Sequence, residues 1–377
     1  MLQAVVATGT AETLPAGDPG ERLPVASHWK LVRRRFLRHR LALAGGITVA
    51  LLYAVVIFAD FLAASDPQTI NAAHALVPPQ RIHLSSAGLY VHPVVRSRNP
   101  DTLVIEFVPD PAVRVPVVFF AQGYPYRLFG LFPTDRHLFG TADAKAENTV
   151  FLLGTDFLGR DLYSRTVLAI RTSLTIGLLA VLVSLVLGVV FGGLSGYYGG
   201  RVDAVIQRII EILRAIPTIP LWMALAVAIP AGWGVTGVYL AITVIISLIG
   251  WTDLGREIRG RVMSLRHEDF VLAAELCGAR PRRIIFIHLL PLCTSHIIAA
   301  TTLALPAMIV SETALSFLGL GLRPPAISLG VLLSAAQSIQ SIALYPWLLW
   351  PAFPTALAIL AFNFMGDGLR DAADPHA

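Results

Sequence analysis

Charged residues are scarce in this sequence of 377 residues. Asp, Glu, Lys and Arg together make up 14% of it, whereas a soluble domain usually carries about a quarter. Hydrophobic residues account for 55%. This balance argues against an ordinary soluble domain and indicates a membrane protein. We therefore expect a lipid bilayer to be the main surroundings of the chain.

Lysine and cysteine are also nearly absent, and each shortage excludes a type of site. Neither Lys30 nor Lys145 follows a glycine, so the chain lacks the Gly-Lys-Ser/Thr element of a P-loop for ATP. Cys277 and Cys293 form no C-x-x-C pair and cannot make a four-ligand metal site. We expect two free thiols, and no cofactor-binding and no metal site in this chain.

Histidine is missing from the middle of every long apolar segment, and this argues against two kinds of protease. The stretch 193–196 matches the short G-x-S-G pattern, but a nucleophilic serine needs a histidine within reach, and His296 stands only at the start of a segment. His267-Glu268 begins an H-E-x-x-H zinc pattern that fails at Val271. We expect no catalytic residue; an intramembrane serine protease stays an alternative that replacement of Ser195 would test.

Apolar segments long enough to cross a bilayer dominate what is present. A hydrocarbon core about 30 Å thick needs about 20 helical residues. Six segments qualify or come close: 41–62, 172–196, 215–231, 235–251, 295–318 and 347–364. The sequence therefore predicts an all-α membrane protein with six transmembrane helices.

Basic residues predict the orientation of these spans. A basic run, from Arg33 to Arg40, precedes the first span, so the N-terminal tail 1–40 is expected in the cytoplasm. Six spans return the tail 371–377 to the same side, and the expected inner loops are rich in arginine. Only the outward arginines between 160 and 171 run against this trend. Orientation explains the pI of about 9.5 without nucleic acid as a partner.

A long polar stretch, 63–165, separates the first span from the five-helix core at 166–370. Long loops escape the charge rule, so this stretch is expected outside the cytoplasm. Leu103–Val108 and Val113–Phe120 read as strands between prolines. The stretch predicts a small extracytoplasmic α/β or β insert, either a contact for a delivery protein or a spacer. Residues 1–27, rich in Ala, Pro and Gly, predict a disordered tail and no signal peptide.

The loop 254–292 is nearly 40 residues of mostly soluble sequence between the fourth and fifth spans. Phe270, Val271 and Ala274 recur at helical spacing, which predicts a short amphipathic helix at the cytoplasmic surface. Pro281 ends that helix and Pro291 marks the return to the membrane.

The stretch Leu272-Ala-Ala-Glu-Leu-Cys-Gly278, followed by Leu290-Pro291, resembles the signature loop of ABC importer permeases. Leu272 stands where that family often has Glu, and His288 where it often has Ile, departures typical of the peptide subclass. Four further stretches resemble the dipeptide/oligopeptide/nickel permeases of the "C" type in the order of that family: 154–165, 196–200, 312–321 and 366–375. The resemblance covers about 153–375, and the first span in outline.

The resemblance implies a transport subunit that forms half of a translocation pathway in the bacterial cytoplasmic (inner) membrane. It implies a homologous second permease, two ABC ATPase subunits that hold ATP and Mg, and an extracytoplasmic substrate-binding protein. It leaves the cargo open among dipeptides, longer peptides, nickel chelates and sugars, with peptides as the first expectation. It also implies a set of residues for docking the ATPase: Asp269, Ala273, Ala274, Gly278 and Pro291.

Glu312 and Ser316 are the polar residues within the fifth span that bear on transport. A charged residue costs about 2.5–3.5 kcal/mol at the centre of a membrane helix, so such groups face a bundle interior or water. Glu312 and Ser316 therefore either line the pathway or a gate, or have a structural role: a hydrogen bond or ion pair between helices, or a position near the outer interface. A secondary transporter is the alternative in class; it would need ion sites at broken helices and no ATPase partner.

Overall fold

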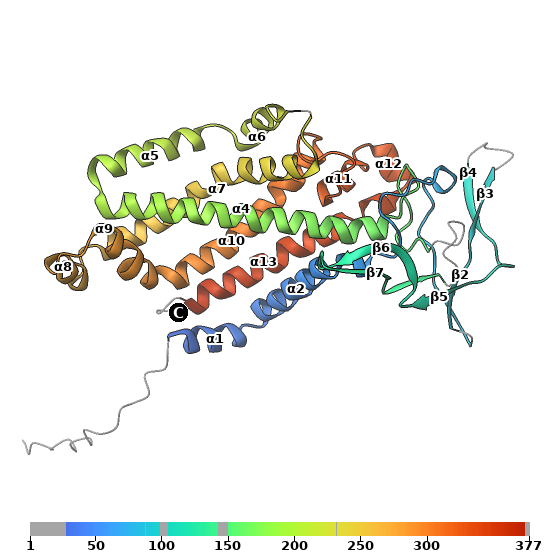
Figure 1. The fold of residues 1–377 in the computed structure, drawn as a ribbon, viewed down its shortest axis with the longest axis horizontal. Coiled ribbons are helices and arrows are strands. Elements are labelled where there is room, and N and C mark those ends of the chain that lie inside the picture. The colour runs from blue at the N-terminus through green and yellow to red at the C-terminus, as the bar shows by residue number, and fades with distance from the viewer. Residues whose placement is uncertain (1–27, 87, 99–104, 142–149, 231, 374–377) are drawn as a thin grey trace, which may run out of the picture.

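The computed structural model describes residues 28–86, 88–98, 105–141, 150–230 and 232–373. The expected N-terminal tail up to residue 27 and the last residues of the C-terminal tail, 374–377, lie outside this part. A bundle of long helices runs along the molecule, with a β-rich insert at one end and the short helix α8 (Asp269–Leu276) at the other (Figure 1).

The long helices supply the candidate membrane spans. Among the described residues, five are long and apolar enough to cross a bilayer, or six if one bent pair counts as a span. They are α2 (Arg40–Ile57), α4 (Leu162–Tyr198), α7 (Val235–Leu265), the continuous stretch α9 (Pro281–Arg283), η3 (Ile284–Leu289) and α10 (Leu290–Phe317), and the stretch from η4 (Pro346–Leu349) through α13 (Ala352–Ala373). The prediction of a six-span helical membrane protein fits this arrangement. Short helices complete it: α1 (His28–Arg38), α3 (Ala59–Leu62), α11 (Leu329–Ser334) and α12 (Ile339–Leu344).

The expected third span, 215–231, is placed differently. It contains only α6 (Thr218–Val227), which is too short to cross, and α5 (Gly200–Ala215) precedes it at an angle of 88°. The residues 201–214, expected in a cytoplasmic loop, form α5 instead, which runs beside α4 (Figure 1). Ile206 and Ile210 give α5 a buried face, whereas the arginines of this segment suggested a cytoplasmic loop.

The expected loop 254–292 is also shorter than predicted, because helix occupies both of its ends. α7 continues to Leu265, and helix resumes at Pro281. Leu254, Ile258 and Val262 recur every four residues and are buried, so the apolar face of α7 extends beyond its apolar run.

The insert is built from antiparallel strands. The main sheet has the order β1 (His83–Ser85), β2 (Gly88–Val91), β5 (Val115–Phe119) and β8 (Phe139–Thr141), with Tyr90 opposite Pro116. β3 (Val94–Arg98) pairs with β4 (Ile105–Pro109), and β6 (Gln122–Leu128) with β7 (Phe132–Arg136). The two strands predicted from the sequence correspond to β4 and β5. In the described part of the insert, one short helix, η1 (Ala72–His74), accompanies the strands, so this part is mainly β.

A polar junction fixes the insert to the bundle. Asp161 caps the N-terminus of α4, and Ser164 accepts hydrogen bonds from the amides of Ala64 (2.9 Å) and Ser65 (3.1 Å). The buried Arg165 donates to the carbonyl of Pro67 over 2.9 Å. Arg165, one of the arginines expected on the outer side against the charge rule, thus joins the insert to α4.

A close helix contact joins α4 to α7 through Gly188, Gly192 and Gly196. A Cβ at Gly192 would lie 2.5 Å from the carbonyl oxygen of Gly255, and one at Gly196 would lie 2.7 Å from that of Arg259. Small residues spaced by four let two helix backbones approach in a membrane, where packing and not the hydrophobic effect drives association. This pair has the most extensive helix–helix contact in the described bundle.

Replacement of Gly192 by Ala is expected to lower stability by about 1–3 kcal/mol, because the added methyl group overpacks the contact with α7. Gly260→Ala is the matched control, since a Cβ at this other helical glycine meets nothing within 4 Å. It should leave stability unchanged or raise it by about 0.5–1 kcal/mol. Thermal unfolding of the purified variants in mild detergent measures both; a Gly192→Ala variant as stable as the parent would contradict the close contact.

Candidate functional site

The short helix α8 lies at the end of the bundle away from the insert (Figure 1). It crosses the gap between α7 and α9, and two neighbouring contacts hold it. Val271 is fully buried in a cluster with Ile258, Val262 and Ile284. Glu275 accepts a hydrogen bond of 2.8 Å from the hydroxyl of Tyr197 at the end of α4. α8 is therefore fastened to both helices of the glycine contact.

A tight turn ends α8 at Gly278. Its φ of +76° is left-handed, and the amides of Gly278 and Ala279 donate to the carbonyls of Glu275 (2.9 Å) and Ala274 (3.0 Å). Glycine is favoured at such a C-terminal turn because a side chain strains this conformation. The left-handed turn is therefore by itself a sufficient reason for a glycine at position 278.

The outer face of α8 is apolar and exposed. The exposed fraction is 90% for Leu276 and 46% for Leu272, and Ala273 between them is exposed too. These three residues share one face of the helix, opposite the buried Val271. A leucine so exposed at a polar end of the molecule has no role in packing within the described chain, and it suits a contact with another protein.

The structure divides the residues predicted for ATPase docking. Asp269 and Ala273 are exposed on α8, whereas Ala274 packs toward the bundle. Gly278 forms the turn, and Pro291 lies on a separate element at the start of α10. Sequence reasoning missed Leu272 and Leu276 as candidates, although their spacing with Ala273 on one helical face could have suggested them.

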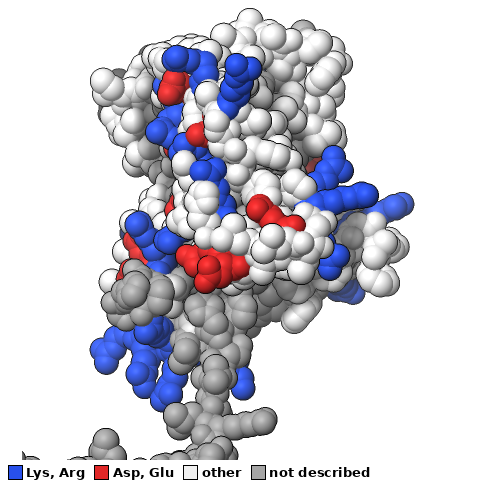
Figure 2. Space-filling model, turned by 90° about the vertical axis from the view of Figure 1, so that its left-hand side faces the viewer, with Lys and Arg blue, Asp and Glu red and all other residues white. Residues whose placement is uncertain are grey.

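Several groups of basic side chains lie at the same end of the molecule, among uncharged ones (Figure 2). Arg256 on α7 and Arg282 and Arg283 on α9 are exposed. A smaller group of acidic side chains lies near the centre of this face (Figure 2). α1, with Arg35 and Arg38 in its last turn, packs against α13, so the described ends of the chain meet near this face.

Ser195, the serine of the G-x-S-G match, belongs to a structural network. Its hydroxyl donates to Asp203 over 2.5 Å, and Arg259 holds the same carboxylate with two hydrogen bonds of 2.6 Å. The amide nitrogen of Gln207 donates to the hydroxyl over 3.2 Å. These contacts tie α4, α5 and α7 together. The hydrogen-bond partners of Ser195 are Asp203 and Gln207, and neither is a histidine that could act as its base.

Glu312 and Ser316 lie in the interior of the bundle, with exposed fractions of 0% and 1%. The hydroxyl of Ser173 on α4 donates to Glu312 over 2.7 Å, and that of Ser316 donates over 2.8 Å. Ser173 in turn accepts from the amide of Leu329 on α11 over 3.1 Å. The carboxylate thus connects three helices through serines.

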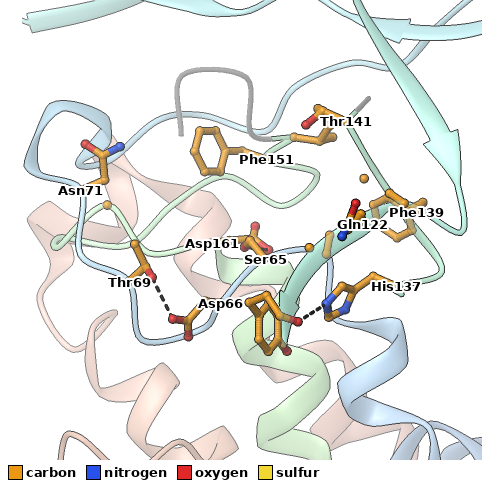
Figure 3. A pocket seen from close by; sticks show the side chains of 17 residues that line it. Ser65, Asp66, Thr69, Asn71, Gln122, His137, Phe139, Thr141, Phe151 and Asp161 are labelled. Atoms are coloured by element: carbon orange, nitrogen blue, oxygen red, sulfur yellow. Dashed lines mark hydrogen bonds between the residues drawn. The ribbon is translucent and has the colours of Figure 1, made fainter. Parts of the chain in front are cut away.

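A cavity of about 390 Å³ opens where the insert meets the bundle (Figure 3). Asp66, Tyr124 and His137 line it. Asp66 accepts from the hydroxyl of Thr69 over 2.9 Å, and His137 contacts the carbonyls of Asp60 and Tyr124 at 3.0 Å each. Burial, and then the nearby Asp60 and Asp66, raise the pKa of Tyr124. Asp66 and His137 thus already have hydrogen-bond partners within the junction between insert and bundle.

Candidate metal ligands do not gather anywhere in the described residues: no group of three or more His, Cys, Asp or Glu side chains could hold an ion. Cys277 is exposed on the turn after α8 and Cys293 is buried in α10, and both are free thiols.

Comparison with known proteins identifies the fold family. Residues 188–377 match the family model described as "Binding-protein-dependent transport system inner membrane component", and residues 27–79 match the "N-terminal TM domain of oligopeptide transport permease C". The second match covers the first span, which the sequence supported only in outline.

Relatives of known name agree with these matches. The oligopeptide transport system permease protein OppC of Bacillus subtilis is 32% identical over 313 residues, which cover 82% of this chain and 96% of that protein. The dipeptide transport system permease proteins DppC of Lactococcus lactis and B. subtilis are 40% and 42% identical, over 63% and 59% of this chain and over 67% and 68% of their own. The chain therefore belongs to the family of binding-protein-dependent ABC importer permeases, multi-pass membrane transport subunits whose ATPase activity resides on partner chains.

Proposed function

We propose that this chain forms half of a peptide translocation pathway and receives the movement of an ABC ATPase through α8. The exposed apolar face of Leu272, Ala273 and Leu276 carries the proposal. A short rigid helix that is fastened to α4 and α7 can transmit a displacement to both. The names of the relatives, oligopeptide and dipeptide permeases, support peptides as the cargo.

The proposed assembly has a homologous second permease, two ATPases with ATP and Mg, and a substrate-binding protein on the outer side. We place the chain in the bacterial inner membrane with both termini in the cytoplasm. The basic residues around α8 support this orientation, because cytoplasmic loops carry an excess of Arg and Lys (Figure 2).

We also propose that Glu312 and Ser316 act as a structural tie and do not line the pathway. Their burial and the hydrogen bonds from Ser173 and Ser316 support a hydrogen-bonded tie between helices over a place in the pathway. A buried carboxylate that accepts from serines on neighbouring helices stabilises their arrangement in a membrane.

Mild-detergent purification of the tagged chain from its native membrane tests the assembly as a whole. A second permease and one or more ATPases should accompany it, and the assembly in vesicles should take up peptides with ATP. Repeated recovery of a folded chain alone would favour a secondary transporter.

Leu276→Asp is expected to weaken docking of the ATPase by about 2 kcal/mol or more, or roughly 30-fold, because it places a charge at the centre of the apolar contact. Co-purification and peptide-stimulated ATP hydrolysis measure the loss. Ile339→Asp is the matched control, since this residue is 87% exposed on α12 at the opposite end. Normal docking by Leu276→Asp would contradict the role of α8.

A pair of substitutions at Gly278 separates docking from backbone strain. Gly278→Ala and Gly278→Trp share the strain of the left-handed turn, about 1–2 kcal/mol, and a Cβ there meets nothing within 4 Å of this chain. The Trp variant alone should lose ATPase co-purification, because its ring extends toward the docking surface. Equal behaviour of the two variants would show that Gly278 serves only the turn.

Glu312→Ala is expected to lower stability by about 1–3 kcal/mol, because the hydroxyls of Ser173 and Ser316 lose a buried acceptor. Glu312→Gln keeps an acceptor and should retain most of the stability. Thermal unfolding in detergent compares them with the parent. If Glu312→Ala unfolds like the parent but alters peptide uptake, Glu312 belongs to the pathway instead.

A further inference from the structure

Three faces can be distinguished on α5. Ile206 and Ile210 are buried against the bundle, and they cluster with Leu187, Leu194 and Trp251. An exposed apolar flank consists of Val205, Ile209 and Ile212, with exposed fractions of 61%, 47% and 57%. The other flank is charged: it holds Arg208, Glu211 and Arg214.

The charged flank makes ion pairs while remaining open to its surroundings. Arg208 and Glu211 pair at 3.0 Å with side chains 75% and 61% exposed. Arg214 pairs with Asp253 of α7, and these side chains are 42% and 76% exposed. We call these four residues the polar flank.

The polar flank lies at the depth of the apolar part of α4. A Cβ added at Gly188 of α4 would lie 2.9 Å from the Cβ of Leu254 on α7. Asp253, the neighbour of Leu254, is therefore level with Gly188. Gly188 precedes the end of the apolar stretch at Gly196 by eight residues, or about 12 Å along a helix. Asp253 therefore lies about two fifths of the way into a bilayer core about 30 Å thick.

Charged side chains this exposed do not face lipid at such a depth. Insertion of one such group at the middle of a membrane helix costs about 2.5–3.5 kcal/mol, and polar residues within spans therefore face water or protein. The apolar flank of α5 suits lipid, and the polar flank points to a different side of the helix.

We propose that the polar flank of Arg208, Glu211, Arg214 and Asp253 lines the water-filled part of the translocation pathway and meets the charged groups of the cargo. The proposal rests on the proposed function, because it takes the pathway to lie beside this subunit. A peptide carries an ammonium and a carboxylate at its ends, and the flank offers partners for both. The arginine forks match a carboxylate, and Glu211 and Asp253 match an ammonium.

Thiol labelling of two variants that each introduce one cysteine tests where the flank points. Ala215→Cys lies one turn beyond Glu211 on the charged side, and Ile212→Cys lies at a similar depth on the apolar side. The complete transporter is reconstituted in lipid nanodiscs and treated with a membrane-impermeant methanethiosulfonate. Peptide mapping separates label at these positions from label at the exposed Cys277.

Position 215 should react about tenfold or more faster than position 212, because the reactive thiolate forms in water and not in hydrocarbon. An unreactive position 215, or equal rates at the two positions, would overturn the proposal. ATP-driven peptide uptake by the parent complex is measured in vesicles from the same preparation. If the parent transports peptides but position 215 is unreactive, only this inference fails; if the parent transports nothing, the proposed function fails.

A charge reversal at Glu211 tests contact with the cargo. Glu211→Arg should lower the uptake of peptides with added lysines relative to peptides with added aspartates, by several-fold in the ratio. Ile212→Ala on the apolar flank should leave the ratio unchanged. An unchanged ratio for Glu211→Arg would overturn the contact with cargo.

Discussion

The close contact between α4 and α7 is the constraint on which the other features depend. Gly192 and Gly196 bring the two backbones together, so that a side chain at either position would collide with a carbonyl oxygen of α7. Within a bilayer, hydrophobic driving force between helices is absent, and such packing has to supply the association. The ends of these two helices that lie away from the insert then hold α8 between them through Val271 and Glu275. A displacement of α8 is therefore a displacement of the α4–α7 pair.

Polar groups inside the bundle follow two different rules. Glu312 is fully buried and hydrogen-bonded to serines, and Asp203 is held by Arg259 and Ser195, so these groups join helices. Arg214 and Asp253 are paired but exposed, although Asp253 lies level with the apolar part of α4. Buried groups of the first kind stabilise one arrangement of the helices, whereas exposed groups of the second kind require water or another protein beside them.

Much of the architecture could be predicted from the sequence because membrane helices leave a strong signal. Apolar runs of about 20 residues revealed the spans, and the short loop helix followed from the spacing of Phe270, Val271 and Ala274. The motifs of that loop also placed the chain in its family, and the family matches agree. The third span was predicted with the wrong bounds: the bent pair of α5 and α6 can form it, but α5 is amphipathic and charged, and such a helix does not register as an apolar run.

The sequence by itself determined the class of protein, the long spans, the β-rich insert and the place of α8 along the chain, since these depend on local composition and periodicity. Only the tertiary structure decided which faces point inward. It buried Ala274 and exposed Leu276, it enclosed Glu312 among serines, and it brought Arg214 beside Asp253. The physical reason is that burial depends on contacts between helices far apart in the chain, and helical periodicity alone does not reveal which partner covers each face.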